Sequence, residues 1–456
     1  MNPARPTPHR SRTVPGIEVL SVFLNETLVG SITRMPGSGD RTIFTFDENY
    51  LNDTERPTLS LSFKGREGDI AYQPRAYSTR IHPFFSNLLP EGKLRDYITE
   101  RDGVNRDREF FLLRALGKDL PGSVIVRPSE EALSVEDSSP SPPEDGPFQE
   151  SGQPLKFSLA GVQLKFSAIR DASGGLTIPA YGLGGSWIVK LPSERFEAVP
   201  ENEYAMMRLA AHAGFPVPEI DLVSISQIQG LPMGLRKDGY AFVIRRFDRD
   251  GSGGQKRIHI EDFAQVFGLT PAEKYGKASY GNIAQVVWTE LGPEGIRDFI
   301  ARLVFNAAIG NGDMHMKNWS LVYPDRRAPQ LAPAYDFLST LTYTTKTEDM
   351  ALSLAKTRNF REVSDDLFLR FADKVGIPPD LVVEAARDAA QRTVDVWNDL
   401  RGEMDIPAYM KGAIEEHMRN IPIIQTTIRH MTTYHTNTLS TAPTPPPISP
   451  GPGLEI

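Results

Sequence analysis

The sequence predicts an α+β protein in which two β-rich segments precede a large, all-helical C-terminal lobe. Alternating apolar and polar residues indicate strands in IEVLSVFLNETLVGSITR, residues 17–34, and strand patterns return from Leu155 onward. After about Ile258 nearly every segment up to His435 has helical spacing, as in EGIRDFIARLVFNAAIG. A chain of 456 residues is too long for one hydrophobic core, so we expect two or three domains.

The first domain is expected over residues 17–128. Its opening hairpin turns at an Asn-Glu pair, and LSLSFKG near Leu59 is expected to continue the β-rich start. FFSNLLPEGKLRDYITE and REFFLLRALGKDLPG then show helical spacing with Gly after each, so helices follow.

Residues 155–257 are expected to form a small β-rich lobe, and residues 258–436 the helical lobe. The small lobe has strand patterns in KFSLAGVQLKFSAI, SWIVKLP and YAFVIRRFD, with one helix in ENEYAMMRLAAHAG.

Three segments are expected to lack fixed structure. Residues 1–16 are basic and Pro-rich without an apolar core segment, which indicates a disordered arm and not a signal peptide. Residues 129–154 are rich in Pro, Ser and acidic residues, which is typical of a solvated linker. Residues 437–456 form a Pro-rich tail.

Composition excludes several classes of function. The chain has no cysteine, which excludes disulfides, thiolate catalysis and Cys-based zinc or iron–sulfur sites. This fits a reducing compartment, and we expect a cytoplasmic protein. The longest apolar runs are too short for a membrane span. A net charge of −8 argues against nonspecific DNA binding over the whole surface, although a local basic patch stays compatible with it.

The most informative stretch is NAAIGNGDMHMKNWSLV, residues 306–322. A helix is expected to end at Gly310, and the loop after it carries Asp313 and Asn318 in D-x-x-x-x-N spacing. WSLVY predicts a strand, PDRRAP a turn, and QLAPAYDF a return strand that brings Asp336 back beside Asn318. This is the layout of a protein-kinase active site, where one Asp accepts the proton of the acceptor hydroxyl while an Asn and a second Asp bind magnesium.

Two other interpretations stay open for this stretch. A helix C-cap explains Gly310 and Asn311, but it gives no role to Asp313, His315 or Lys317. A metal site could use Asp313 and His315, although two residues on one loop are a weak ligand pattern without further histidines. The D-x-x-x-x-N spacing also occurs often by chance.

Lys190 stands within the otherwise apolar strand WIVKLP. It either extends its ammonium to solvent at the strand end or is the lysine that holds ATP phosphates in a kinase. Glu201 or Glu203 on the next helix could position it, with Glu203 favoured, although any helix prefers acidic residues in its first turn.

The phosphate-binding loop is less clear in the sequence. There is no G-x-G-x-x-G motif, and GLGG at Gly182 predicts only a turn. The better candidate is SLAGVQLK, residues 158–165, where small residues around Gly161 permit close approach of the backbone to a ligand.

Taken together, these segments resemble the HipA family of serine/threonine kinase toxins. SLAGVQLKFS, WIVKLP, ENEYAMMRLAAHAG, VIRRFDR, NGDMHMKN and AYDF occur in the family's order, and FFSNLLPEGKLR and LGKDLPGSV resemble its N-terminal subdomain. The resemblance covers about residues 17–400. It implies a bilobal protein-kinase-like fold with an extra N-terminal subdomain, related distantly to eukaryotic protein kinases and lipid kinases.

The resemblance also implies roles for individual residues. Asp313 is expected to be the catalytic base, with Asn318 and Asp336 as ligands of Mg²⁺. Ser158 matches the serine that family members autophosphorylate, and a phosphate there would add about −1.5 to −2 charges to a loop that must hold the phosphates of ATP. The residues expected to bind ATP are Ala160, Gly161, Val162, Gln163, Leu164, Lys165, Lys190, Arg245, Arg246, Phe247, His315, Met316, Lys317, Asn318, Tyr335 and Asp336. Arg245 departs from the family's hinge pattern, where a Glu is expected, so a side-chain contact to adenine is in doubt there.

Finally, the resemblance implies partners. These are a helix-turn-helix antitoxin similar to HipB, operator DNA through it, and a protein substrate such as an aminoacyl-tRNA synthetase, with no membrane partner. Two rival functions remain, namely a small-molecule or lipid kinase with the same Asp, Asn and Asp arrangement, and an inactive partner of a DNA-binding antitoxin. Intact Lys190, Asp313, Asn318 and Asp336 count against the inactive partner.

Overall fold

A computed structural model describes residues 18–37, 39–101, 103–129, 164–171, 175–178, 184–231, 238–250, 256–344 and 349–429. The expected arm at 1–16, nearly all of the linker at 129–154 and the tail at 437–456 lie outside these residues. So do Ser158 and residues 160–163 of the expected phosphate loop.

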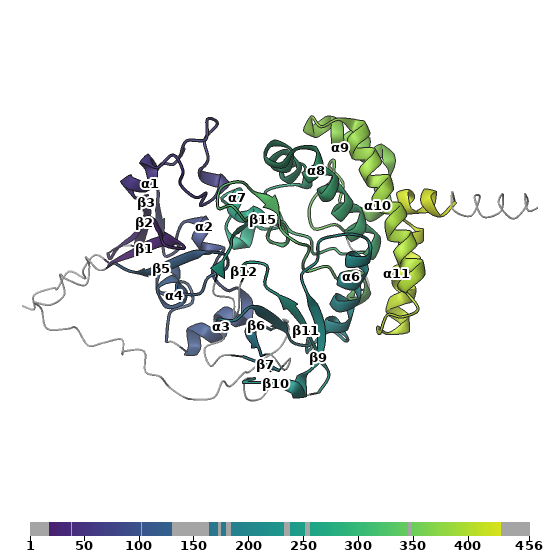
Figure 1. The fold of residues 1–456 in the computed structure, drawn as a ribbon, viewed down its shortest axis with the longest axis horizontal. Helices are drawn as coiled ribbons and strands as arrows, with labels where there is room; N and C mark the ends of the chain where they lie inside the picture. Colours follow the sequence, from purple (N-terminus) through teal and green to yellow (C-terminus); the bar gives the residue numbers. More distant parts are fainter. Residues whose placement is uncertain are drawn as a thin grey trace, which may run out of the picture.

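The N-terminal domain is a five-stranded antiparallel sheet in the order β4-β3-β2-β1-β5, with short helices packed on it (Figure 1). The predicted opening hairpin and the helical segments after it are confirmed, and Asn25 takes the left-handed conformation that the turn requires. Phe44, Phe84, Phe85 and Phe110 are buried in its core. The elements are β1 (Glu18–Leu24), β2 (Thr27–Met35), β3 (Arg41–Phe46), α1 (Glu48–Asn52), β4 (Ala76–Ser78), α2 (Pro83–Ser86), α3 (Gly92–Arg101), α4 (Glu109–Leu116) and β5 (Val124–Pro128).

The expected continuation of this sheet at LSLSFKG is wrong. Leu61–Phe63 forms a single 3₁₀ turn, capped by the Ser60 side chain. The backbone N–H of Leu61 donates to the buried carboxylate of Glu261, 3.0 Å away, in the C-terminal lobe. A contact between domains therefore overrides the local strand preference of these residues.

The second sheet has six strands in the order β10-β7-β6-β8-β11-β9. β8 (Trp187–Lys190) lies between β6 (Lys165–Arg170) and β11 (Tyr240–Arg245), so Lys190 sits in the middle of the sheet. Helix α6 (Val199–His212) packs Met206 and Leu209 into the same core as Phe242 of β11. The remaining strands are β7 (Leu176–Thr177), β9 (Ile220–Ser224) and β10 (Ile228–Gln229).

The C-terminal lobe is built mainly from helices, which lie beside one another at one end of the molecule (Figure 1). The largest hydrophobic core of the described chain runs through them and includes Phe299, Phe305, Phe368 and Trp397. The helices are α7 (Phe263–Val266), α8 (Tyr280–Ile309), α9 (Asp365–Val375), α10 (Pro379–Leu400) and α11 (Ala408–Arg419).

The expectation of an all-helical lobe is wrong, because the lobe also contains β-strands. β14 (His259–Asp262), β15 (Ser320–Tyr323) and β16 (Gln330–Leu331) form a three-stranded antiparallel sheet in this lobe. The pair of β12 (Arg249–Asp250) and β13 (Lys256–Arg257) lies within the expected β-rich lobe. β14 is too short for its periodicity to be recognised in the sequence. The return strand is also shorter than expected: the backbone N–H of Ala332 still donates to Ser320 of β15, but that of Ala334 donates to the carbonyl of Pro216 instead.

The N-terminal domain contacts both other parts of the chain. Its loop at Asp119 and Gly122 bonds to the segment after β11, and α2 accepts a 3.0 Å hydrogen bond from Gln265 of α7 at the carbonyl of Phe84. Within the described residues, every helix is either too short or too polar to cross a membrane.

Candidate active site

The centre of the site is the side chain of Lys190. Its Nζ lies 2.5 Å from Oε1 of Glu203 on α6 and also contacts Oδ1 of Asp336, which follows β16. Lys190 is 8% exposed and Glu203 1%. The structure therefore brings together three residues from the sheet, the helix and the C-terminal lobe, and it selects Glu203 over Glu201 as the partner of Lys190.

Burial and charge determine the protonation of these three groups. Burial alone would lower the pKa of Lys190, but the carboxylates of Asp336 and Glu203 outweigh it and raise that pKa. Burial would raise the pKa of Asp336, but Lys190 and Lys165 lower it to about 2. Burial raises the pKa of Glu203 to about 7 against the opposing effect of Lys190. Near neutral pH, Lys190 is thus a cation fixed beside the Asp336 anion.

The loop after α8 is shaped by its first two residues. Gly310 ends the helix in the left-handed conformation, at φ 68°, and a side chain there would collide with Leu341. The buried Asn311 donates to Oδ1 of Asn306 at 2.9 Å and to the carbonyl of Asp336 at 3.2 Å. The C-cap interpretation is therefore correct for Gly310, and Asn311 additionally ties the loop to the segment of Asp336.

Asp313 and Asn318 face one another across this loop. The Asn318 amide donates to the carbonyl of Asp313 at 2.9 Å, which leaves its Oδ1 free of partners among the described residues. Oδ1 of Asp313 accepts a 2.6 Å hydrogen bond from the hydroxyl of Tyr275. Tyr275 was not predicted as a site residue, because a tyrosine in an irregular loop has no periodic or motif signal.

His315 is buried beside the same tyrosine. Its ring centroid lies 4.9 Å from that of Tyr275 in an edge-on arrangement. Burial lowers the pKa of His315, which keeps the ring neutral at pH 7, and its Nδ1 has no hydrogen-bond partner within the part of the chain described here. Met316 is buried in the hydrophobic core, so its side chain packs and does not face a ligand.

Asn318 and Asp336 fit the ligand preferences of Mg²⁺, because both present oxygen atoms and Asp336 is ionised. Their neighbours Lys317 and Tyr335 are joined by a 3.0 Å hydrogen bond from the Tyr335 hydroxyl to the Lys317 carbonyl. The described residues contain no group of three or more His, Asp or Glu that could hold a metal, so the two oxygen donors would need ligands from a nucleotide. Asp336 has a positive φ of 57°, a conformation that is uncommon for Asp and typical of functional sites.

The expected hinge lies at the end of β11. The backbone N–H of Arg245 bonds to Glu219 and that of Arg246 to Ser186, each at 2.8 Å. The Arg245 side chain is exposed and lies 3.9 Å from Glu219, so it extends toward solvent. The ring of Phe247 packs on that of Tyr335 with centroids 5.6 Å apart. These two aromatic residues, both expected in the ATP site, are thus in contact.

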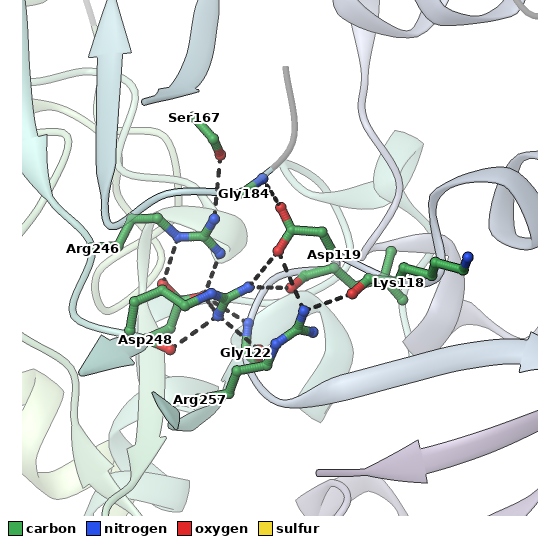
Figure 2. A network of polar contacts seen from close by, with 10 residues as sticks. Lys118, Asp119, Gly122, Ser167, Gly184, Arg246, Asp248 and Arg257 are labelled. Atoms are coloured by element: carbon green, nitrogen blue, oxygen red, sulfur yellow. Dashed lines mark hydrogen bonds and ion pairs between the residues drawn. The ribbon is translucent and has the colours of Figure 1, made fainter. Parts of the chain in front are cut away.

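A buried polar network joins Arg246 of the hinge to Asp248 and to the N-terminal domain, as Figure 2 shows. Arg246 makes two hydrogen bonds to Asp248, of 2.9 and 2.7 Å, and a third to Ser167 of β6 at 3.2 Å. Asp248 accepts from the backbone of Gly122 at 2.8 Å. Each of the three guanidinium nitrogens of Arg246 therefore donates to a protein partner, which fixes this side chain within the network.

The same network reaches the N-terminal domain through Asp119. Its Oδ1 lies 3.0 Å from Nη2 of Arg249, and its Oδ2 accepts from the backbone N–H of Gly184. Nη2 of Arg257 lies 3.6 Å from Oδ1 of Asp119.

Of the expected phosphate loop, only Leu164 and Lys165 are described. Leu164 is buried, and Lys165 is exposed and paired in register with Lys190.

Two family domains of known proteins match most of the chain. The HipA N-terminal domain matches residues 20–127, and the HipA-like C-terminal domain matches residues 157–397. The protein named "Putative kinase Y4dM" of Sinorhizobium fredii is 45% identical over 90% of this chain and 98% of its own. The serine/threonine-protein kinase toxin HipA of Shewanella oneidensis is 26% identical over 82% of this chain and 87% of its own.

A solved structure shares the fold. It is HipA of Shewanella oneidensis in complex with HipB and its operator DNA, with a TM-score of 0.65, 22% identity, and coverage of 90% of this chain and 97% of the other. The chain is a kinase, an enzyme that uses ATP. The chain belongs to the HipA family.

Proposed function

We propose that the protein is an ATP- and Mg²⁺-dependent serine/threonine protein kinase of the HipA toxin type. The observation that carries this proposal is the contact of Lys190 with both Glu203 and Asp336, beside the loop of Asp313. A fixed ammonium next to a fixed carboxylate suits a site that binds triphosphate and metal together.

In this proposal, Asp313 accepts the proton of the acceptor hydroxyl as the hydroxyl oxygen bonds to the γ-phosphorus and the bond to ADP breaks. Lys190 stabilises negative charge on the phosphates, and Asn318 and Asp336 hold Mg²⁺. When bound, Mg²⁺ neutralises charge on the β- and γ-phosphate oxygens. Adenine binds at the hinge of residues 245–247 through backbone groups, next to the Phe247 and Tyr335 rings, and residues 160–165 cover the phosphates.

The direct test is incubation of the purified protein with magnesium and labelled ATP beside the Asp313→Ala variant. Asp313 lies on a half-buried loop and not in a core, so we expect the variant to fold and to lose transfer. Label in wild type alone supports the proposal. Wild-type turnover in Asp313→Ala would show that the assigned base is wrong.

We further propose that Ser158 is an autophosphorylation site that silences the enzyme. A phosphate with about −1.5 to −2 charges would repel the phosphates of ATP from the adjoining loop. Phosphopeptide mapping should find the label on Ser158 in wild type and not in Asp313→Ala. A Ser158→Ala variant should then retain activity during prolonged incubation.

The proposed acceptor is a serine of a translation component such as an aminoacyl-tRNA synthetase. The proposed partner is a HipB-like antitoxin with a helix-turn-helix, since the similar HipA of Shewanella oneidensis was solved with HipB and operator DNA. Screening purified synthetases for label tests the first proposal, and a shift of operator DNA by the antitoxin with and without this protein tests the second. Label on a small hydroxyl compound or a lipid instead would favour the alternative class of kinase.

A further inference from the structure

The side chain of Lys317 points into the N-terminal domain. Its Nζ lies 2.8 Å from Oε1 of Glu91, 3.0 Å from the carbonyl of Asn87 and 3.2 Å from Oδ1 of Asn87. Asp262 adds a weaker ion pair at 3.8 Å. An ammonium group has three protons, and three acceptors within hydrogen-bond distance use all of them.

The acceptors are held in place by their own contacts. Asn87 is 6% exposed, and its amide donates to the carbonyls of Pro83 and Leu269, at 2.9 and 2.7 Å, which turns Oδ1 toward Lys317. Burial would raise the pKa of Glu91, but Lys317 and Lys274 lower it, so the carboxylate is charged at neutral pH. Both residues lie in the break between α2 and α3.

Glu91 also contacts a second lysine near the catalytic loop. Its Oε2 lies 3.2 Å from Nζ of Lys274, whose carbonyl accepts from the backbone N–H of Met316 at 3.3 Å. The next residue is Tyr275, which donates to Asp313. One carboxylate of the N-terminal domain thus holds two segments that meet at the expected catalytic base.

We infer that Lys317 is a positioning residue that fastens the catalytic loop to the N-terminal domain through Glu91 and Asn87, and that its ammonium does not bind phosphate. Lys317 lies next to Asn318, so displacement of its side chain moves an expected metal ligand. Misplacement of catalytic groups by about 1 Å can lower turnover by about a hundredfold. The inference rests on the proposed kinase activity and concerns the same site.

The chain offers a matched control. Lys64 of the N-terminal domain and Glu290 of α8 form another ion pair between the domains, 2.7 Å long. Neither residue belongs to the catalytic loop. Glu91→Gln and Glu290→Gln therefore remove the same charge from the same domain interface. Lys317→Met removes the ammonium, and Lys317→Arg keeps the charge.

The experiment measures kcat and KM for ATP, the Kd of a non-hydrolysable ATP analogue with magnesium, and hydrogen exchange of residues 313–319. We expect Glu91→Gln and Lys317→Met to lower kcat about tenfold or more and to speed exchange in the loop. The Kd of the analogue should change to the same extent in Glu91→Gln and Lys317→Met, because both variants release the same loop. Glu290→Gln should match wild type in kcat, KM, Kd and hydrogen exchange. Lys317→Arg should have a higher kcat than Lys317→Met.

Two results would overturn the inference. One is a Kd that rises at least about tenfold in Lys317→Met while Glu91→Gln behaves as wild type, since this is the signature of a phosphate ligand. The other is unchanged exchange in Glu91→Gln. If wild type itself transfers no phosphate, the proposed function fails. The comparison of hydrogen exchange between Glu91→Gln and Glu290→Gln still tests whether Glu91 fastens the loop of residues 313–319 to the N-terminal domain.

Discussion

Tyr275 donates a hydrogen bond to Asp313, with 2.6 Å between its hydroxyl oxygen and Oδ1 of the carboxylate. The tyrosine is 42% exposed, so its side chain is accessible to solvent beside Asp313. Burial and the neighbouring Asp313 raise the pKa of Tyr275, so the hydroxyl stays protonated and keeps donating. The hydrogen bond from Tyr275 fixes Oδ1 of Asp313. In the proposed mechanism, Oδ2 is then the oxygen that accepts the proton of the acceptor hydroxyl.

Tyr275→Phe should therefore lower kcat about tenfold while KM for ATP stays unchanged, because a hydrogen bond to a carboxylate contributes about 1.5–3 kcal/mol to its placement. Steady-state kinetics at saturating acceptor measures the effect. The ring contact with His315 is kept in this variant, so packing changes little. A rise in turnover would show instead that Tyr275 blocks the base.

Lys190→Ala should weaken ATP binding and also destabilise the fold, because Glu203 is left buried without its cation. Removal of one partner of a buried ion pair costs about 3–5 kcal/mol. The loss should be smaller at pH 6 than at pH 8, since a Glu203 with a pKa of about 7 is neutralised by protonation. Thermal unfolding at both pH values measures this.

The double variant Lys190→Ala with Glu203→Gln separates the two effects of Lys190. It should recover much of the Tm that Lys190→Ala loses, since Glu203, the more deeply buried of the two carboxylates that contact Lys190, is no longer an anion, and recover none of the ATP binding. Equal Tm values for the single and double variants would contradict the role given to Glu203.

Asp119→Asn should destabilise the hinge network of Figure 2, because Arg246, Arg249 and Arg257 would then share the single carboxylate of Asp248. We expect a loss of about 2 kcal/mol in the free energy of unfolding, together with a raised Kd for nucleotide. Denaturant unfolding and calorimetry measure both. Asp96→Asn is the control, because its pair with Arg106 is exposed and should matter little.

Glu261 should make stability depend on pH. Burial raises its pKa to about 7 although Ser60, Tyr323 and Leu61 donate to it, so the folded protein binds a proton here that the unfolded chain releases. The stabilisation is complete below the unfolded pKa near 4.5 and is lost as pH rises through about 7.

The matching variant is Glu261→Gln, which cannot titrate. Relative to wild type, its free energy of unfolding should improve by up to about 3 kcal/mol between pH 4.5 and pH 8. Thermal melts of both proteins across that range measure the difference. A difference that stays constant with pH would mean that Glu261 does not titrate in this window. His259 nearby has a pKa lowered by burial to about 4 in both proteins, so its opposite pH effect cancels in the comparison.

Local patterns predicted much of the site. The Asp313 to Asn318 spacing, the Gly310 helix end and the β15–β16 hairpin are properties of consecutive residues, so they could be expected from sequence. Lys190 was found because a charged residue in an apolar strand is conspicuous. Glu203 could be favoured but not chosen, since only the orientation of α6 decides which acidic residue faces the sheet.

Features that depend on contacts between domains could not be predicted. LSLSFKG has the composition of a strand, but its backbone bonds to Glu261 of another domain. Glu91, Asn87 and Asp119 are ordinary polar residues in sequence, and their roles arise only when the N-terminal domain docks. Tyr275 reaches Asp313 from a loop before α8, so no motif spacing connects the two.

The contacts of the N-terminal domain also have a consequence for folding cooperativity. Glu261, Asp248 and Lys317 each have hydrogen-bond partners in that domain, so its detachment would leave buried polar groups of the remainder without these partners. A state with one domain folded and the other unfolded is therefore strongly disfavoured. We expect a single calorimetric transition whose van't Hoff and calorimetric enthalpies agree, and we expect that the two family domains cannot be separated into stable fragments.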